Sequence, residues 1–331
     1  METSQHDLAS PQHDRKTFDA KSKKRISYIL PTKDKAQYLR VILSRFHNAI
    51  RPEDELIVVD GLSTDKSPDT VDEFDSIIDV YVSEPDISPG HAFNKGFLLA
   101  SGKYIKLIND DDVFYLEAMD QAAEVMDRHS EVDVLVCGGT RQRGDAVRTL
   151  WLPPGTNYGK KAEDIFRYPS SGTGYFIRRS SLSRIGIFNA DSVAVDADFL
   201  CRAISKGGLV KFCRINMFHK IMYDHSAVFK LRSEWTSDYY RICRQYCSHR
   251  FYISFRWMLF KREHPFLQVI NGVLTLPLRI VRVLRKNGVR GLFERVGRGI
   301  SFLIQGKTKG PSDQDQSIRG QHHFIWDGGF S

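Results

Sequence analysis

Several patterns that would assign a chain to a common functional class are missing from this sequence. Its five cysteines are odd in number and none forms a CxxC pair, which argues against a disulfide framework or a zinc ribbon and favours a reducing compartment. No apolar strand is followed by GxGxxG, and GxxxxGK[ST] does not occur. Dinucleotide binding and P-loop chemistry are therefore disfavoured.

Long apolar segments are also missing. Residues 1–24 are polar and charged, without the apolar core of a signal peptide, and we expect a disordered leader there. No run reaches ~18 uninterrupted apolar residues, the length that spans a bilayer. Residues 266–283 come closest, but Asn271, Pro277 and Arg279 interrupt them. The sequence predicts a cytoplasmic protein.

The charge of the chain is unevenly distributed. The 331 residues are 41% hydrophobic and carry a net charge of +8, and residues 241–309 are heavily basic. No nucleic-acid-binding motif accompanies the charge, so we expect no nucleic acid partner. Basic, aromatic amphipathic helices suit a membrane interface, and they could also pack on the rest of the protein as a cap. Residues 231–305 are therefore expected either to contact a membrane peripherally or to form a cap, and a flexible tail over 306–331 is expected to follow.

Short apolar runs alternate with helical patterns in the first third of the chain. Strands are expected at residues 26–30, 56–59, 79–82 and 104–108, and helices at residues 38–46, 69–74 and 91–100. This alternation predicts an α/β fold with a Rossmann-like, mainly parallel sheet flanked by helices.

Each predicted strand ends in polar residues. In a parallel sheet these ends share one edge, where ligands bind. The last strand runs into three adjacent carboxylates, Asp110, Asp111 and Asp112, which repel one another unless a positive charge lies among them. A hard divalent cation that also binds phosphates would supply that charge. The alternative is an acidic turn that caps the helix beginning near Tyr115.

Six short motifs occur in order along residues 25–112. They are SYILPT (27–32), LIVVDGLSTD (56–65), SEPD (83–86), NKG (94–96), ASGKYI (100–105) and LINDDD (107–112). With these motifs the chain resembles family 2 glycosyltransferases, which are inverting enzymes with the GT-A fold. The resemblance continues more loosely to about residue 225. It implies a catalytic domain over residues 25–230, with a nucleotide-sugar half (25–112) and an acceptor half (113–230).

The resemblance also implies roles for residues near the donor. Thr32 and Asp60 are expected to contact the nucleoside, and Asp86 the nucleotide side of the cleft. Asn94 and Lys95 are expected near the donor, although the surface end of a helix explains the NKG motif (94–96) equally well.

The metal-binding motif departs from the family pattern, because Asn109 stands where the family often has the first Asp. Aligned on the last pair, Asp111 is the principal ligand of a Mn²⁺ or Mg²⁺ ion, Asp112 assists and Asp110 lies near the ribose. Aligned on spacing alone, Asp110 and Asp112 form the DxD. We favour the first alignment. His225 is a further candidate that would face metal or diphosphate, and a structural histidine is the alternative.

An inverting transferase needs a general base that deprotonates the acceptor hydroxyl, and a carboxylate can do this. The family places this Asp in a Glu-Asp pair that opens a helix. Here Val195 replaces the Glu, Asp196 is the expected base and Asp198 is the second choice. The alternative is N-capping of the helix by either carboxylate.

The resemblance and these residues together predict a metal-dependent, inverting hexosyltransferase. It would move a sugar from a nucleotide diphosphate-sugar, with a UDP-sugar favoured, to a hydroxyl of a glycan or lipid-linked acceptor in cell-surface polysaccharide synthesis. Because many members of the family act on lipid-linked acceptors at the cytoplasmic face, the resemblance also favours peripheral membrane contact of residues 231–305. Two rival hypotheses are a catalytically dead GT-A fold that acts as a membrane-docked binding protein, and a sugar nucleotidyltransferase. The latter would show a Gly-rich basic loop after the first strand, where this chain has PTKD (31–34).

Overall fold

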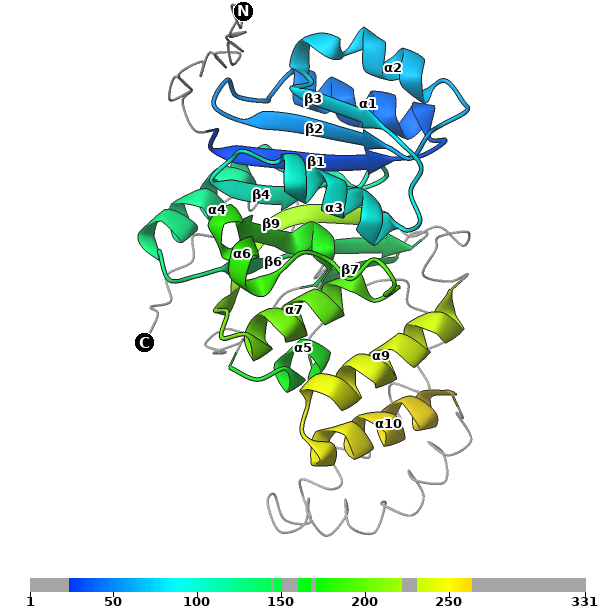
Figure 1. The fold of residues 1–331 in the computed structure, drawn as a ribbon, viewed down its shortest axis with the longest axis vertical. Helices are drawn as coiled ribbons and strands as arrows, with labels where there is room; N and C mark the ends of the chain where they lie inside the picture. Colours follow the sequence, from blue (N-terminus) through cyan, green and yellow to red (C-terminus); the bar gives the residue numbers. More distant parts are fainter. Residues whose placement is uncertain (1–23, 144–145, 151–159, 168–170, 222–230, 264–331) are drawn as a thin grey trace, which may run out of the picture.

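The computed structural model describes residues 24–143, 146–150, 160–167, 171–221 and 231–263, which form a mixed sheet flanked by helices (Figure 1). The strands are β1 (Ile26–Thr32), β2 (Glu55–Asp60), β3 (Val80–Ser83), β4 (Tyr104–Leu107), β5 (Val113–Phe114), β6 (Val134–Arg143), β7 (Ala146–Leu150), β8 (Tyr175–Arg178) and β9 (Val210–Ile221). Their order is β3-β2-β1-β4-β8-β6-β9-β5, with β7 paired to β6. The predicted α/β fold class is confirmed.

The four strands predicted from the sequence form one parallel block. β1 pairs in parallel with both β2 and β4, and β2 pairs in parallel with β3. In this register Thr32 pairs with Asp60, and Asp60 pairs with Ser83, so the polar strand ends lie side by side. Beyond β4 the sheet is mixed, because β8 runs antiparallel to both β4 and β6. The sheet that we expected to be mainly parallel is parallel from β3 to β4 and again between β6 and β9, and its antiparallel pairs are those made by β8, β7 and β5.

Helices cover both faces of the sheet (Figure 1). They are α1 (Ala36–His47), α2 (Ser67–Glu73), α3 (Pro89–Leu99), α4 (Leu116–Arg128), α5 (Glu163–Arg167), α6 (Leu182–Ile185), α7 (Val195–Ser205), α9 (Arg232–Tyr246) and α10 (His249–Glu263), with 3-10 turns η1 (Asp75–Ile77), η2 (Gly172–Gly174) and η3 (Arg179–Ser181). Successive β1 residues point to opposite faces. Tyr28 packs on Phe46 of α1, and Ile29 lies in the core on the α3 side.

Close packing of α3 on β1 depends on Gly96. A Cβ atom at this position would lie 2.2 Å from Cγ2 of Ile29, far inside contact distance. Gly96 lies within α3 and faces β1. The NKG motif is therefore part of the helix–sheet interface, and the interpretation as a helix surface ending does not apply to its glycine.

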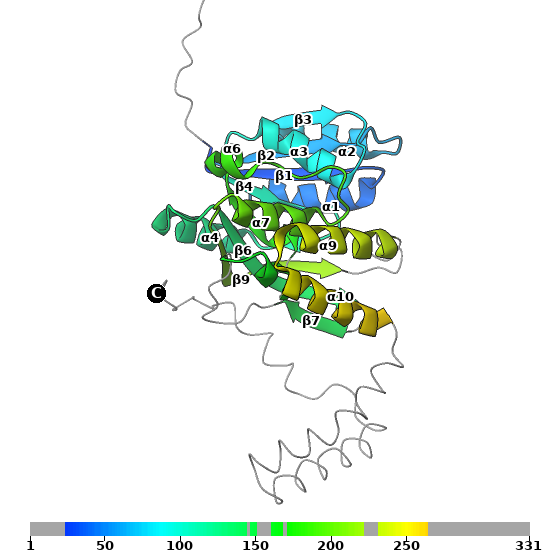
Figure 2. The same ribbon diagram turned by 60° about the horizontal axis from the view of Figure 1, so that its bottom comes forward.

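The antiparallel strand β8 brings the acceptor half to the edge where the parallel strands end. Its register with β4 pairs Lys106 with Phe176, so the start of β8 lies beside the end of β4. The turn η2 directly precedes β8 and therefore reaches that same edge. Helix α7 packs on α9, which in turn contacts α10 (Figure 2).

Several predictions fall on residues outside the described ranges. These are most of the leader (residues 1–23), His225, the basic segment from residue 264 to 305 and the tail over 306–331. Within the described ranges, none of the helices has both the length and the apolar character needed to cross a membrane.

Candidate active site

Asp60 is the last residue of β2 and lies at the edge of the sheet where the polar strand ends meet. Its side chain is fully buried and accepts hydrogen bonds from the Ser63 backbone N–H at 3.1 Å and from Ser83 Oγ at 2.8 Å. The Ser63 hydroxyl also donates to Asp60. A buried carboxylate is stable only when donors surround it, and these supply that requirement. Ser63 thus helps to hold the carboxylate at the sheet edge.

The loops after β1 and β2 are joined to each other beside Asp60. The Asp34 backbone N–H donates to Ser63 Oγ at 2.8 Å, and the Thr64 backbone N–H donates to Asp34 Oδ1 at 2.7 Å. Asp34 and Leu62 both adopt left-handed backbone conformations, with φ of 49° and 61°. Such conformations are costly for residues other than glycine and cluster at functional sites. The two loops form one rigid rim.

Asp110 and Asp111 share a cation from the chain itself. Thr32 Oγ1 donates to Asp110 Oδ2 at 3.2 Å, and Lys35 Nζ lies 2.7 Å from Asp110 Oδ1 and 3.5 Å from Asp111 Oδ2. Burial raises the pKa of Asp110 above its usual range, against the opposing effect of Lys35. Burial tends to lower the pKa of Lys35, but the two carboxylates outweigh it, so the pKa of Lys35 is raised.

Asp112 is the least satisfied carboxylate of the cluster. It is 6% exposed; Oδ2 accepts from Asn109 Nδ2 at 2.9 Å, while Oδ1 is buried without a hydrogen-bond partner among the described residues. Burial raises the pKa of Asp112 to about 6, and the charge of Lys220 opposes the shift. An unpaired oxygen in a set of hard oxygen donors fits a divalent cation.

The three adjacent carboxylates do not by themselves form a complete metal site. Within the described ranges, no three His, Cys, Asp or Glu side chains are arranged to hold a metal ion. A Mg²⁺-type site commonly takes only one or two protein carboxylates and completes its shell with substrate phosphates. The cluster fits a site of that kind.

Asp86 and Lys95 lie together beside the loop after β3. Lys95 Nζ is 3.0 Å from Asp86 Oδ1 and donates to the backbone carbonyls of Glu84 and Pro85 at 3.1 and 3.0 Å. His91 Nδ1 lies 3.5 Å from the same Asp86 oxygen. The ammonium of Lys95 therefore holds the loop that follows β3.

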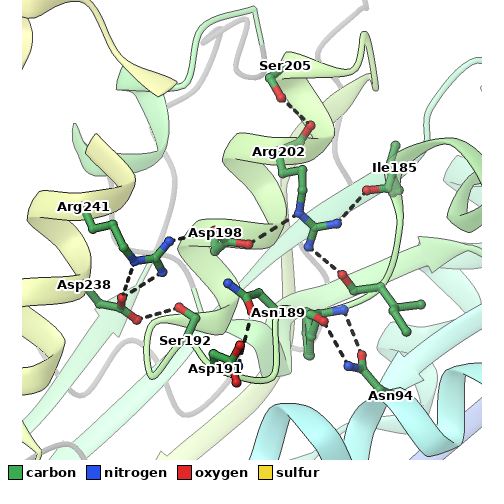
Figure 3. A network of polar contacts seen from close by, with 12 residues as sticks. Asn94, Ile185, Asn189, Asp191, Ser192, Asp198, Arg202, Ser205, Asp238 and Arg241 are labelled. Carbon is green, nitrogen blue, oxygen red and sulfur yellow. Dashed lines mark hydrogen bonds and ion pairs between the residues drawn. The ribbon is translucent and has the colours of Figure 1, made fainter. Parts of the chain in front are cut away.

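Asn94 joins the two halves of the protein (Figure 3). Its Nδ2 donates to the Phe188 carbonyl at 2.9 Å, and its Oδ1 accepts from the Phe188 backbone N–H at 2.8 Å. Both polar ends of the amide are thus engaged by one residue of the segment that leads to α7. This geometry gives Asn94 a structural role whether or not it also contacts a donor.

Asp196 and Asp198 have different surroundings although both lie in the first turn of α7. Asp196 is partly exposed, and its Oδ2 accepts from the Gly172 backbone N–H of η2 at 3.0 Å. Asp198 is 3% exposed and lies 3.4 Å from Arg202 Nε and 3.9 Å from Arg241 Nη1 (Figure 3). Asp196 therefore faces the sheet edge, whereas Asp198 belongs to a buried ionic network.

Lys106 is a buried lysine that the sequence reasoning missed. It is 1% exposed, lies on β4 and donates from Nζ to the carbonyls of Leu107, at 2.8 Å, and Thr173. Burial lowers the pKa of Lys106 to about 7. Because Thr173 belongs to η2, Lys106 connects the strand leading to Asp110 with the turn that contacts Asp196. The signal in the sequence was a single lysine inside an otherwise apolar strand.

Lys35 is the second residue that the sequence reasoning missed. It lies in the loop after β1, directly after the PTKD segment (31–34), and the sequence motifs gave it no role. The signal that could have found it is positional, because a lysine three residues after Thr32 must lie at the same edge as Asp110. His225, the remaining predicted metal ligand, lies outside the described residues.

Comparison with known proteins finds relatives of this chain. The model of the family described as "Glycosyl transferase family 2" matches residues 27–187 of this chain. The poly(ribitol-phosphate) beta-N-acetylglucosaminyltransferase TarS of Staphylococcus aureus is 28% identical over 126 residues, which are 36% of this chain and 22% of TarS. An uncharacterized glycosyltransferase of Rickettsia prowazekii is 24% identical over 213 residues, 62% of this chain and 63% of the relative. The chain spans less than two thirds of the length of each of these relatives.

Solved structures share the fold. TarS 1–349 in complex with UDP-GlcNAc superposes with a TM-score of 0.52 at 18% identity, over 67% of this chain and 65% of that one. The mannosyltransferase PcManGT of Pyrobaculum calidifontis, solved with GDP-Man and Mn²⁺, also gives 0.52 at 16% identity, over 84% and 80% of the two chains.

Proposed function

This chain is a glycosyltransferase that belongs to glycosyl transferase family 2, and from that premise we propose that it is a metal-dependent, inverting enzyme. It moves a sugar from a UDP-sugar to a hydroxyl of a glycan or lipid-linked acceptor. The observation that carries the proposal is that η2 and Asp196 reach the sheet edge where Thr32, Asp60 and Asp110 lie. Donor carboxylates and a candidate base thereby share one edge.

The donor half binds and orients the nucleotide. Thr32 and the buried Asp60 hold the nucleoside, Asp110 accepts from the ribose, and Asp86 with Lys95 borders the nucleotide. Asp111 and Asp112 hold the Mn²⁺ or Mg²⁺ ion, and the unpartnered Asp112 Oδ1 supports this assignment. When bound, the ion offsets the negative charge that develops on the leaving diphosphate. TarS and PcManGT, which were solved with a UDP-sugar and with a GDP-sugar and Mn²⁺, support a donor of this class.

The acceptor half supplies the base. The Gly172 backbone N–H donates to Asp196 Oδ2, so Asp196 Oδ1 is the oxygen that accepts the proton of the acceptor hydroxyl. As the hydroxyl oxygen attacks the anomeric carbon, its proton passes to Asp196, and the bond between that carbon and the diphosphate oxygen breaks with its electron pair on the leaving group. The ion pairs of Asp198 with Arg202 and Arg241 make it the poorer candidate, since its charge is already matched.

The proposal also includes peripheral contact with an anionic membrane. Large apolar side chains of α10 are exposed, among them Ile253, Trp257 and Met258, on a helix that also carries Arg250 and Arg256. α10 does not separate its apolar and basic side chains into two faces, so the support for membrane contact is the exposure of these apolar side chains beside arginines that can pair with anionic headgroups. Cosedimentation with vesicles of anionic lipid, and its loss in Ile253→Ser/Met258→Ser, tests this contact. Equal sedimentation with purely zwitterionic vesicles would contradict the electrostatic part.

The first experiment measures nucleotide release from UDP-, GDP- and dTDP-sugars with Mn²⁺, with Mg²⁺ and with EDTA. We expect release from one donor with metal, a large loss with EDTA and a similar loss in Asp111→Asn. Asp72→Asn, on the exposed surface of α2, is the matched control and should retain full activity.

The rival functions give different results when candidate acceptors, or a nucleoside triphosphate with a sugar 1-phosphate, are added to this assay. A catalytically dead binding protein would bind the donor without release in the presence of every acceptor tested. A sugar nucleotidyltransferase would release pyrophosphate from a nucleoside triphosphate and a sugar 1-phosphate. Either result would replace the proposed transfer reaction.

A further inference from the structure

Lys35 reaches the carboxylate cluster from a fixed base at the start of α1. Its backbone N–H donates to Ser67 Oγ at 3.3 Å, and its carbonyl accepts from the Leu39 N–H at 3.0 Å. Because the first residue of α2 and the first turn of α1 hold the backbone, only the side chain of Lys35 is free to change direction. At present its ammonium lies on Asp110 and Asp111.

The ammonium occupies oxygens that a divalent cation would need. Oδ2 of Asp111, 3.5 Å from Lys35 Nζ, is an oxygen of the residue assigned above as principal ligand. An ion bound at about 2.1 Å from that carboxylate would be strongly repelled by an ammonium at this distance. Asp112 is only 6% exposed, and its Oδ1 has no hydrogen-bond partner among the described residues. The cluster therefore still has an open acceptor. Lys35 thus pairs with Asp110 and Asp111, whereas Asp112 keeps one oxygen available to a cation.

We propose that Lys35 is an internal counter-ion of the donor site, which competes with the divalent cation for Asp111 and, once displaced, pairs with the diphosphate of the donor. The inference rests on the proposed function, because it assumes that donor and metal bind at this cluster. It predicts that the metal binds weakly to the free protein and more tightly together with a nucleoside diphosphate. The linkage is reciprocal, so the nucleotide also binds more tightly with metal.

The test compares Mn²⁺ binding to the full chain, measured by the EPR signal of free Mn²⁺ in the absence of nucleotide. We expect Lys35→Met to bind Mn²⁺ about tenfold more tightly than the wild type, since the competing charge is gone. Lys66→Met removes one positive charge from the neighbouring loop, where the side chain is exposed, and should leave the affinity unchanged. Lys35→Arg retains the charge and should resemble the wild type.

Binding of UDP in the presence of metal gives the opposite sign. By calorimetry at a Mn²⁺ concentration that saturates both proteins, Lys35→Met should bind UDP about tenfold more weakly than the wild type, because the diphosphate loses the displaced ammonium. A general loss of structure would not raise the affinity for Mn²⁺ and lower the affinity for UDP in the same variant. Urea unfolding of each variant checks that it is folded.

Unchanged Mn²⁺ affinity in a folded Lys35→Met, or unchanged UDP affinity at saturating Mn²⁺, overturns the inference. If the wild type still releases nucleotide from its donor in a metal-dependent manner, the proposed function survives that result. If neither the wild type nor Lys35→Met binds Mn²⁺ or UDP, the inference and the proposed function fail together.

Discussion

The two halves of the protein place their functional side chains by different means. In the donor half, Thr32, Asp60 and Asp110 stand at or just after the ends of parallel strands, and neighbouring strands fix their spacing. In the acceptor half, Asp196 stands on a helix and reaches the same edge through a hydrogen bond from Gly172. The donor residues are thus set by sheet register, whereas the acceptor residue depends on a turn held by long-range contacts. Changes on the acceptor side should affect catalysis more than donor binding.

The largest effect is expected for Asp196→Asn. The amide oxygen can still accept the Gly172 N–H, so the geometry is retained while the proton acceptor is lost. We expect kcat for nucleotide release to fall by about 10²- to 10⁴-fold, the usual contribution of a general base. The dissociation constant of the donor, measured by calorimetry, should stay within about twofold.

Asp191→Asn is the matched control, because Asp191 is an exposed carboxylate in the segment before α7. It should leave both constants unchanged. If Asp196→Asn weakened donor binding as strongly as it lowered kcat, the two halves would not divide donor and acceptor duties in the way described.

The sequence predicted the donor half well because its information is local. Apolar runs predicted β1, β2 and β4 to within two residues at each end, and the parallel arrangement placed Asp60 and Asp110 at one edge. The approach of η2 to Lys106 could not be predicted, since the contact joins residues 67 positions apart through an antiparallel pairing that leaves no periodic pattern. Lys35 was missed for a related reason: its partner Asp110 lies 75 positions away.

Lys106 tests the connection between the two halves. Burial lowers the pKa of Lys106 from the ordinary lysine value of 10.5 to about 7 in the folded protein. Between these values the unfolded chain binds more protons than the folded chain, so this group makes the protein more stable as pH rises. Relative to Lys106→Met, the free energy of unfolding of the wild type should therefore increase by about 2 kcal/mol from about pH 7 to about pH 9.

Urea unfolding of both proteins at the two pH values measures this difference, and the subtraction cancels the titration of other lysines. Lys106→Met also releases the Thr173 carbonyl and with it η2, so kcat should fall while donor affinity is kept. An unfolding difference between wild type and variant that does not change with pH would mean that Lys106 stays charged in the folded protein.

Asn94 offers the smallest but most direct test of how the halves are joined. In Asn94→Ala the backbone N–H and carbonyl of Phe188, a residue 5% exposed, lose their partners, and we expect the free energy of unfolding to fall by about 2 kcal/mol. Asn48→Ala, at the exposed end of α1, should cost less than about 1 kcal/mol. If the family resemblance is right that this position is near the donor, donor affinity falls as well. A loss of stability with unchanged donor affinity would instead make Asn94 a link between the halves, and would remove it from the donor site.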